Sequence, residues 1–319
     1  MCDRDALHFF KDKKWKVIHN KTVLNYEISS STKNKVVVAV IDTGIDYTHE
    51  DLQGKIWNNT DEIPDDGLDN DNNGYADDVY GWNFYDNNNI VFSETEEDTH
   101  GTMIAGIIAA NKNHLGIVGV AGIVDVEIEI LKVTSSGEIC PASKIIEAIQ
   151  YAENSGAQIC NISMTIEEGD ELAETIKNSN MLFIVAAGNN DSIGGVDIDK
   201  YPVYPASLRY DNIITVANLS WEGNIYTTSN YGKEAVDIAA PGVCIYSTAV
   251  NNHYAYNTGT SFSTPIVTGA AVYLYAVNPT ISASEARKNI LSNAIEKKDL
   301  CMSVNKGRVL KVSKLIDFK

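Results

Sequence analysis

The sequence has few basic residues for its length. Its 319 residues include 25 lysines and arginines against 43 aspartates and glutamates, so the formal net charge is -18. A nucleic-acid-binding protein needs a positively charged surface for the phosphates, and an anionic membrane surface would repel this chain. We therefore expect neither nucleic acid nor a membrane among its partners, and the sequence leaves the oligomeric state open.

Long apolar runs are also missing. No run reaches the roughly 18 residues that a membrane-spanning helix needs. The N-terminal stretch MCDRDALHFFKDKKWKVIHNK has no apolar core of the kind that a secretion signal requires. These absences predict a cytoplasmic protein if the chain is full length, and a secreted one if a signal and a pro-segment have been removed.

Cysteine is scarce. The five cysteines are odd in number and widely spaced, and they form no C-x-x-C pair: Cys2, Cys140, Cys160, Cys244 and Cys301. This pattern favours reduced thiols over a disulfide framework.

What the sequence does contain is a regular alternation of strand and helix signals. Continuous apolar runs, typical of strands covered on both faces, occur at residues 36–41, 126–133, 157–162, 181–187 and 213–217. Between the second and third runs, apolar residues fall at helical spacing and Gly156 stands where a helix would stop. The alternation predicts an α/β fold, a three-layer sandwich whose central, mostly parallel sheet is flanked by helices. We see no linker or repeat, so we expect a single domain over residues 1–319, with an N-terminal extension at 1–35.

One segment differs from the rest in charge. Residues 56–111 contain no lysine or arginine, and thirteen carboxylates lie between residues 61 and 98. So many uncompensated negative charges would repel one another in a compact fold. The region 56–98 is therefore either a solvated acidic loop or a loop folded around divalent cations.

The spacing within this acidic region favours calcium. Acidic and amide side chains alternate before Gly74, which permits a tight turn, and a backbone carbonyl and a further carboxylate follow. Hard oxygen ligands at this spacing suit Ca²⁺. The pattern resembles an EF-hand loop, although Tyr80 occupies the position of the bidentate glutamate. The candidate ligands are Asp69, Asp71, Asn73, Tyr75 and Asp77.

Three separated motifs carry residues suited to catalysis. Asp42 ends the first predicted strand, at the edge where α/β proteins place ligands and catalysts. His100, in DTHGTMIAG, begins a small-residue helix and can project beyond its end. Ser261, in NTGTSFSTP, precedes Pro265, which suits the first turn of a helix whose unpaired N–H groups favour a developing anion.

Each residue also has an ordinary structural explanation. Asp42 could cap a loop, and His100 could serve only packing. Ser261 or Ser263 could be a helix N-cap. Taken together and in this order, however, an aspartate, a histidine and a serine form the constellation for nucleophilic acyl transfer.

The motifs VAVIDTGID, HGTMIAGIIAA, VAAGNN and GTSFSTPIVTGAA, in this order between about residues 36 and 291, resemble those of subtilisin-like serine proteases. The resemblance implies a subtilisin-like fold. It also implies that Ser261 is the nucleophile, His100 the general base and Asp42 the group that orients the histidine. Asn189 would donate a hydrogen bond to the oxyanion, although Gly-Asn-Asn is also a common turn sequence.

The resemblance further implies an extended substrate strand paired with residues 134–138 and 163–165. The walls of the first specificity pocket would be Ser163, Met164, Thr165, Ala186, Ala187 and Gly188. Thr165 stands where the family usually has glycine and would add bulk. Alignment on the second Tyr-Pro pair puts Asp199 at the pocket floor, which would favour cleavage after a basic residue. Asp197, or neither carboxylate if Asp199 is a solvated loop acid, remains an alternative.

A second calcium site is implied by the same resemblance. The loop that follows the histidine helix would supply ligands together with an upstream carboxylate. These ligands are Asp51, Asn113, Leu115 and Ile117.

We therefore expect a serine endopeptidase with probable structural Ca²⁺, acting on a peptide or protein substrate. Two biological roles fit: a leader peptidase for a ribosomally made peptide, and a general turnover protease. An esterase with the same triad and an inactive calcium-binding interaction module are the competing interpretations.

Overall fold

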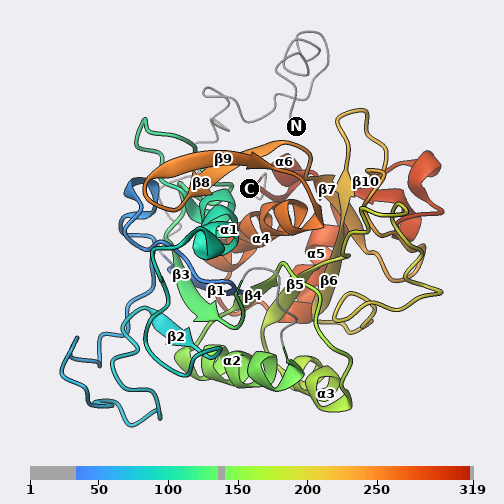
Figure 1. The fold of residues 1–319 in the computed structure, drawn as a ribbon. Coiled ribbons are helices and arrows are strands. Elements are labelled where there is room, and N and C mark those ends of the chain that lie inside the picture. The colour runs from blue at the N-terminus through green and yellow to red at the C-terminus, as the bar shows by residue number, and fades with distance from the viewer. Residues whose placement is uncertain (1–33, 136–140, 317–319) are drawn as a thin grey trace.

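A computed structural model describes residues 34–135 and 141–316. Within these residues, a nine-stranded sheet lies between two layers of helices (Figure 1), in the order β10-β11-β7-β6-β5-β4-β1-β3-β2. All neighbouring strands are parallel except β10 and β11, which are antiparallel. The predicted three-layer α/β sandwich is thus confirmed. The strands of this sheet are β1 (Val36–Asp42), β2 (Gly81–Asn83), β3 (Val126–Lys132), β4 (Ile159–Ile162), β5 (Leu182–Ala186), β6 (Ile213–Leu219), β7 (Ile238–Pro241), β10 (Ile295–Glu296) and β11 (Arg308–Val309).

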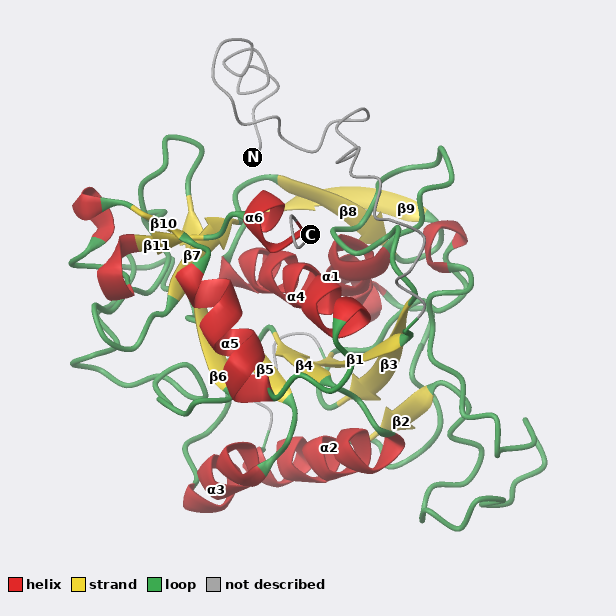
Figure 2. Ribbon diagram, turned by 180° about the vertical axis from the view of Figure 1, so that it is seen from behind, coloured by secondary structure: helices red, strands yellow, loops and turns green. Residues whose placement is uncertain are grey.

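The helices divide between the two faces of the sheet. Figure 2 shows α2 and α3 on one side and α1, α4 and α5 on the other. Each face buries its own apolar cluster, one formed with α1 and α4 and one with α2 and α3. The helices are α1 (Thr99–Ala109), α2 (Ala142–Ser155), α3 (Asp170–Asn178), α4 (Thr260–Val277), α5 (Ala283–Ser292) and α6 (Val312–Ile316).

Strand β1 shows why a continuous apolar run becomes a central strand. Its side chains alternate between the two clusters: Val36, Val38 and Val40 face α1 and α4, whereas Ala39 and Ile41 face α2. A strand with both faces covered needs apolar residues at every position. This arrangement carries Asp42 to the carboxyl end of the strand, between two layers of protein.

Two helix boundaries were predicted from single residues. Helix α2 ends where Gly156 takes a left-handed conformation with φ 87°, as the sequence predicts. Helix α4, by contrast, begins at Thr260, so Pro265 lies inside the helix at its sixth residue and not in the first turn. The prediction for Pro265 was wrong because proline is also tolerated deeper in a helix when the carbonyl four residues earlier finds another donor.

A two-stranded hairpin, β8 (Ile245–Ala249) and β9 (His253–Asn257), lies across α1 (Figure 1). Two buried hydroxyls of β8 donate hydrogen bonds to carbonyls of α1: Ser247 Oγ to Met103 O at 2.7 Å and Thr248 Oγ1 to Thr102 O at 2.7 Å. The hairpin therefore fixes α1 from the side away from the sheet.

The cysteine prediction needs a correction. Cys244 is disulfide-bonded, whereas Cys160 and Cys301 are free. The expectation of reduced thiols was wrong for Cys244, because a disulfide depends on which cysteines the fold brings together and not on their spacing in sequence. Cys2 and Cys140 lie outside the described residues. In the part of the chain that the structure describes, no helix is long and apolar enough to cross a membrane.

Candidate active site

The three sequence motifs meet at one edge of the sheet. Asp42 ends β1, His100 is the second residue of α1, and Ser261 is the second residue of α4. A Cβ atom on Gly101 would lie 2.2 Å from the carbonyl oxygen of Gly44 and 3.2 Å from Asp42 Oδ1. Only glycine allows α1 to approach the strand so closely.

Asp42 and His100 form a tight pair. His100 Nδ1 lies 2.7 Å from Asp42 Oδ1, which also accepts the Thr43 N–H at 2.8 Å. The aspartate is 1% exposed, and the histidine side chain 30%. Burial by itself lowers the pKa of His100, but the charge of Asp42 and the hydrogen bond together raise it above 6.5. The bond at Nδ1 leaves Nε2 free to act as a base.

Ser261 is held by a reciprocal pair of hydrogen bonds with Ser163. The Ser261 hydroxyl donates to the Ser163 carbonyl at 2.8 Å, and the Ser163 hydroxyl donates to the Ser261 carbonyl at 3.0 Å. The Ser261 carbonyl is available because Pro265, four residues later, has no N–H. The ring of Phe262 lies 5.5 Å from that of His100. The residue after Ser261 thus contacts the histidine ring, while the serine hydroxyl itself is turned toward Ser163.

Asn189 lies next to the serine motif. Its side-chain oxygen accepts the backbone N–H of Thr260 at 3.0 Å. The amide group Nδ2 is therefore free to point elsewhere, and the residue is exposed. A Cβ on Gly259 would lie 3.4 Å from Nδ2. The amide thus lies beside the start of α4, where the backbone N–H of Ser261 is a second donor.

The predicted walls of the first pocket lie around Gly188. Ser163, Ala186, Ala187 and Gly188 are buried, Met164 is half-buried, and Thr165 is exposed. A Cβ on Gly188 would lie 3.3 Å from Thr165 Cγ2 and 3.6 Å from Val203 Cγ1. Val203, which directly precedes Tyr204-Pro205, is a neighbour of Gly188 that the sequence analysis did not name. Of the predicted strand-pairing segments, Thr134 is buried, and residues 136–138 lie outside the described residues.

The carboxylate of Asp199, which was predicted to lie at the pocket floor, contacts the 231–235 turn and Arg209. Its carboxylate accepts the backbone N–H groups of Glu234 at 3.0 Å and Ala235 at 2.8 Å, and it lies 3.7 Å from Arg209. The alternative, Asp197, pairs with Lys200 at 2.7 Å. Both carboxylates serve local structure because the loop before Tyr201 folds back on the 231–235 turn, which the alignment could not show.

The acidic region brings some of the predicted calcium ligands together. Carboxylate oxygens of Glu62, Asp69 and Asp71 lie within 4.8 Å of one another. The sequence analysis missed Glu62 because this residue lies upstream of the ligand pattern. A reversal of the loop brings Glu62 next to Asp69 and Asp71. Asp77 points away from this group, since its carboxylate accepts the N–H groups of Asp66 and Gly67. Two other candidates remain. Asn73 Oδ1 accepts the Tyr75 N–H at 2.8 Å. The ring centroid of Tyr75 lies 5.0 Å from that of Tyr151.

The second predicted calcium site is only partly assembled. Asp51 is buried, and its Oδ2 accepts the Ile117 N–H and the Tyr254 hydroxyl, both at 3.0 Å. Its Oδ1 is buried and has no hydrogen-bond partner. The Asn113 side-chain oxygen accepts the Leu115 N–H at 2.9 Å.

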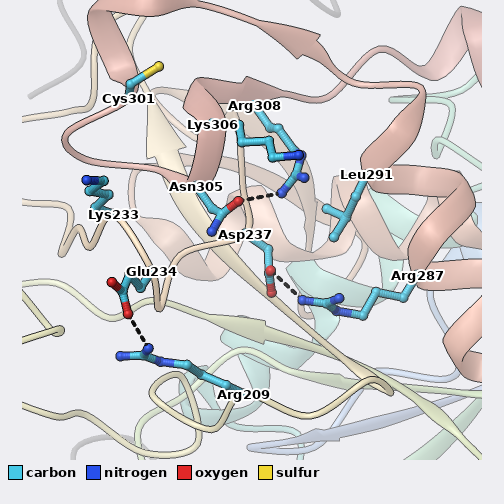
Figure 3. Close-up of a pocket in the computed structure, with 10 residues that line it drawn as sticks. All are labelled: Arg209, Lys233, Glu234, Asp237, Arg287, Leu291, Cys301, Asn305, Lys306 and Arg308. Carbon is cyan, nitrogen blue, oxygen red and sulfur yellow. Dashed lines mark hydrogen bonds and ion pairs between the residues drawn. The ribbon is translucent and has the colours of Figure 1, made fainter.

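A cavity of about 710 Å³ lies elsewhere, between α5 and the strands β7 and β11 (Figure 3). Three hydrogen bonds and ion pairs cross it: Arg287 to Asp237 at 2.6 Å, Arg209 to Glu234 at 2.6 Å and Arg308 to Asn305 at 2.9 Å. None of Asp42, His100 and Ser261 lines it. The cavity is therefore separate from the candidate active site, and its charges hold neighbouring segments together.

Comparisons with known proteins agree with this geometry. A sequence model of the subtilase family matches residues 33–313. Subtilisin-like protease 1 of Plasmodium berghei (strain Anka) is 32% identical over 289 residues, which are 85% of this chain and 47% of that protein. A thermophilic serine proteinase of Bacillus sp. (strain AK1) is 35% identical over 269 residues, 81% of this chain and 55% of that protein. The A-subunit of the AB5 toxin from E. coli superposes with a TM-score of 0.68 at 26% identity, covering 89% of this chain and 92% of that one. The chain spans about half the length of these curated relatives.

Proposed function

The chain belongs to the subtilase family, and from that premise we propose that it is a serine endopeptidase with Ser261 as its nucleophile. The observation that carries this proposal is the 2.7 Å hydrogen bond between His100 and Asp42, located beside the start of the helix that presents Ser261. The roles are those that the triad has in subtilisins.

In the proposed reaction, the Ser261 hydroxyl rotates about its Cα–Cβ bond from the Ser163 carbonyl toward His100 Nε2. The imidazole takes the hydroxyl proton as the oxygen attacks the peptide carbonyl, and later gives it to the leaving amine. Asp42 holds the tautomer that carries the proton on Nδ1 and stabilises the imidazolium once it forms.

The negative charge on the tetrahedral oxygen needs donors that are already in place. We propose the Asn189 amide and the Ser261 backbone N–H for this role. Support comes from the bond between Asn189 Oδ1 and the Thr260 N–H, which orients the amide so that Nδ2 faces away from that contact. Donors that are fixed before the reaction stabilise the transition state without reorganisation.

In our proposal, the first pocket accepts a small substrate residue such as glycine or alanine. A Cβ on Gly188 would lie 2.8 Å from Asn230 Nδ2, 3.3 Å from Thr165 Cγ2 and 3.6 Å from Val203 Cγ1, and we propose that these two methyl groups narrow the pocket. The contacts of Asp199 do not support the alternative, cleavage after a basic residue, because Arg209 and two backbone N–H groups already compensate its charge. A narrow pocket fits a processing enzyme, such as a leader peptidase, better than a turnover protease.

We also propose a structural calcium site in the acidic region, held by Glu62, Asp69 and Asp71. Three converging carboxylates suit a hard divalent cation, and in its absence their charges would repel. Calcium would offset this repulsion and stabilise the folded loop. We propose the second site as well: the unpartnered Asp51 Oδ1 supports it, and the Ile117 N–H holds the other carboxylate oxygen in place.

Labelling with a fluorophosphonate probe tests the proposed activity, because the reagent reacts with an activated serine. We expect labelling of the parent protein and none of Ser261→Ala, with Ser263→Ala as the matched control that keeps the label. Absence of labelling in the parent would favour the inactive calcium-binding module. Mass spectrometry of products from a mixed peptide library, with an ester substrate in parallel, then separates a peptidase from an esterase and reads the pocket preference.

A further inference from the structure

A buried ion pair lies directly behind the Asp42–His100 pair. Lys132 ends β3 and is the register partner of Asp42 across the parallel strands. Its side chain is 3% exposed, and Nζ lies 2.5 Å from Asp98 Oδ1. Asp98 is fully buried, and its Oδ2 accepts the Ser93 N–H at 2.6 Å.

Asp98 is attached to both catalytic motifs. It immediately precedes α1, and its carbonyl accepts the Thr102 hydroxyl at 2.7 Å. The Thr102 Oγ1 in turn accepts the Asp46 N–H at 2.9 Å. A Cβ on Gly44 would lie 2.5 Å from Asp98 Oδ1. The carboxylate therefore fills the space between the turn after Asp42 and the start of the histidine helix.

Packing alone would not require charges here. Taking two ionic groups out of water is costly, and well-packed apolar side chains of similar volume often stabilise a protein as much. The ion pair instead has an electrostatic effect: near the imidazole, the field of the Asp98 carboxylate cancels that of the Lys132 ammonium. We propose that Asp98 and Lys132 are positioning residues that fix the start of α1 and keep the local field at His100 neutral apart from the charge of Asp42.

The charged groups around His100 come from three elements. Asp42 faces it from β1, Asp98 lies before its own helix, and Lys132 reaches in from β3; from α4, the neighbours Ser261 and Phe262 are neutral. At an effective dielectric constant of about 20, a single buried charge about 10 Å from an imidazole shifts its pKa by on the order of one unit. Removing one charge of the pair therefore leaves the charge of the other uncompensated near the imidazole.

The proposal predicts shifts of opposite sign. In Lys132→Met, the remaining Asp98 carboxylate should raise the pKa of His100 by about one unit, and in Asp98→Asn the remaining ammonium should lower it by a similar amount. The double variant should return near the parental value. The exposed pair Glu174 and Lys177 supplies the matched control: Glu174→Gln and Lys177→Met should change nothing.

The measurement is an NMR titration of His100 in the Ser261→Ala protein, with the pH profile of kcat/KM in the active protein beside it. The titration reports the pKa even if the proposed peptidase activity, on which the catalytic meaning rests, were absent. Shifts of the same sign in both single variants, or a loss of activity with an unchanged pKa, would overturn the electrostatic role. If Lys132→Met or Asp98→Asn does not fold, Lys132→Gln or Asp98→Ser takes its place, because each removes the same charge and should give the same shift.

Discussion

Glu129→Gln should stabilise the protein at alkaline pH, although it removes one of the few charged residues in the central strands. Glu129 lies within β3, is fully buried, and neither of its carboxylate oxygens has a hydrogen-bond partner. Burial raises the pKa of Glu129 from 4.5 to about 8, and the charge of Asp78 adds to the effect. The nearby Ser155 hydroxyl offsets little, because it donates to the Ala152 carbonyl.

The sign follows from proton linkage. The folded protein holds the Glu129 proton more tightly than the unfolded chain, so unfolding releases a proton between pH 4.5 and about 8. The contribution of the Glu129 proton to the free energy of unfolding is fully present below pH 4.5. It is lost as the pH rises to about 8. At about 1.4 kcal/mol per pKa unit, the full loss is on the order of 5 kcal/mol. Glutamine cannot ionise and avoids this loss.

The assay is denaturant unfolding at pH 5 to 9 in the Ser261→Ala background, which prevents autolysis. The free-energy advantage of Glu129→Gln over its parent should grow by about 4 kcal/mol across that range. Glu127→Gln, on the same strand but paired with Lys35 at the surface, is the matched control and should show no such trend. A constant difference between Glu129→Gln and the parent would mean that the pKa of Glu129 is the same in the folded and unfolded states, and the reasoning would be refuted.

Four further predictions concern the site. Asn189→Ala should lower kcat by about 10² to 10³ with little change in KM, the range known for the equivalent donor in subtilisin, and steady-state kinetics with a peptide substrate checks it. Val203→Gly should widen the first pocket and shift cleavage toward larger residues in a peptide library; an unchanged preference would exclude Val203 from the pocket. Chelation should lower the melting temperature of the parent but much less that of Glu62→Gln, and equal effects on both would place the metal elsewhere. Because the pKa of His100 is raised, the acid limb of kcat/KM against pH should have its midpoint above 6.5, and a midpoint below this value would contradict the contribution of Asp42.

Sequence reasoning succeeded where the signal was local. The run around Val38 has to be covered on both faces, so the strand and the position of Asp42 at its end could both be predicted. His100 and Ser261 lie within short motifs whose glycines are needed for close packing, as the contact between Gly101 and Gly44 shows. These features depend on neighbours in the chain.

The features that were missed depend on chain segments that meet only after folding. Glu62 joins the acidic cluster through a reversal of the loop, and Val203 reaches the pocket through the arrangement before Tyr204. The disulfide at Cys244 has the same origin. No spacing rule encodes such contacts, because loop conformation sets them.

The hairpin that lies over α1 also sets the order of events when the protein is made. Ser247 and Thr248 follow their α1 partners by 144 and 146 positions. Contacts between such distant segments form late, because a long stretch of chain must first be ordered. A chain that ends before the hairpin therefore lacks the two hydroxyls that hold the histidine helix from this side.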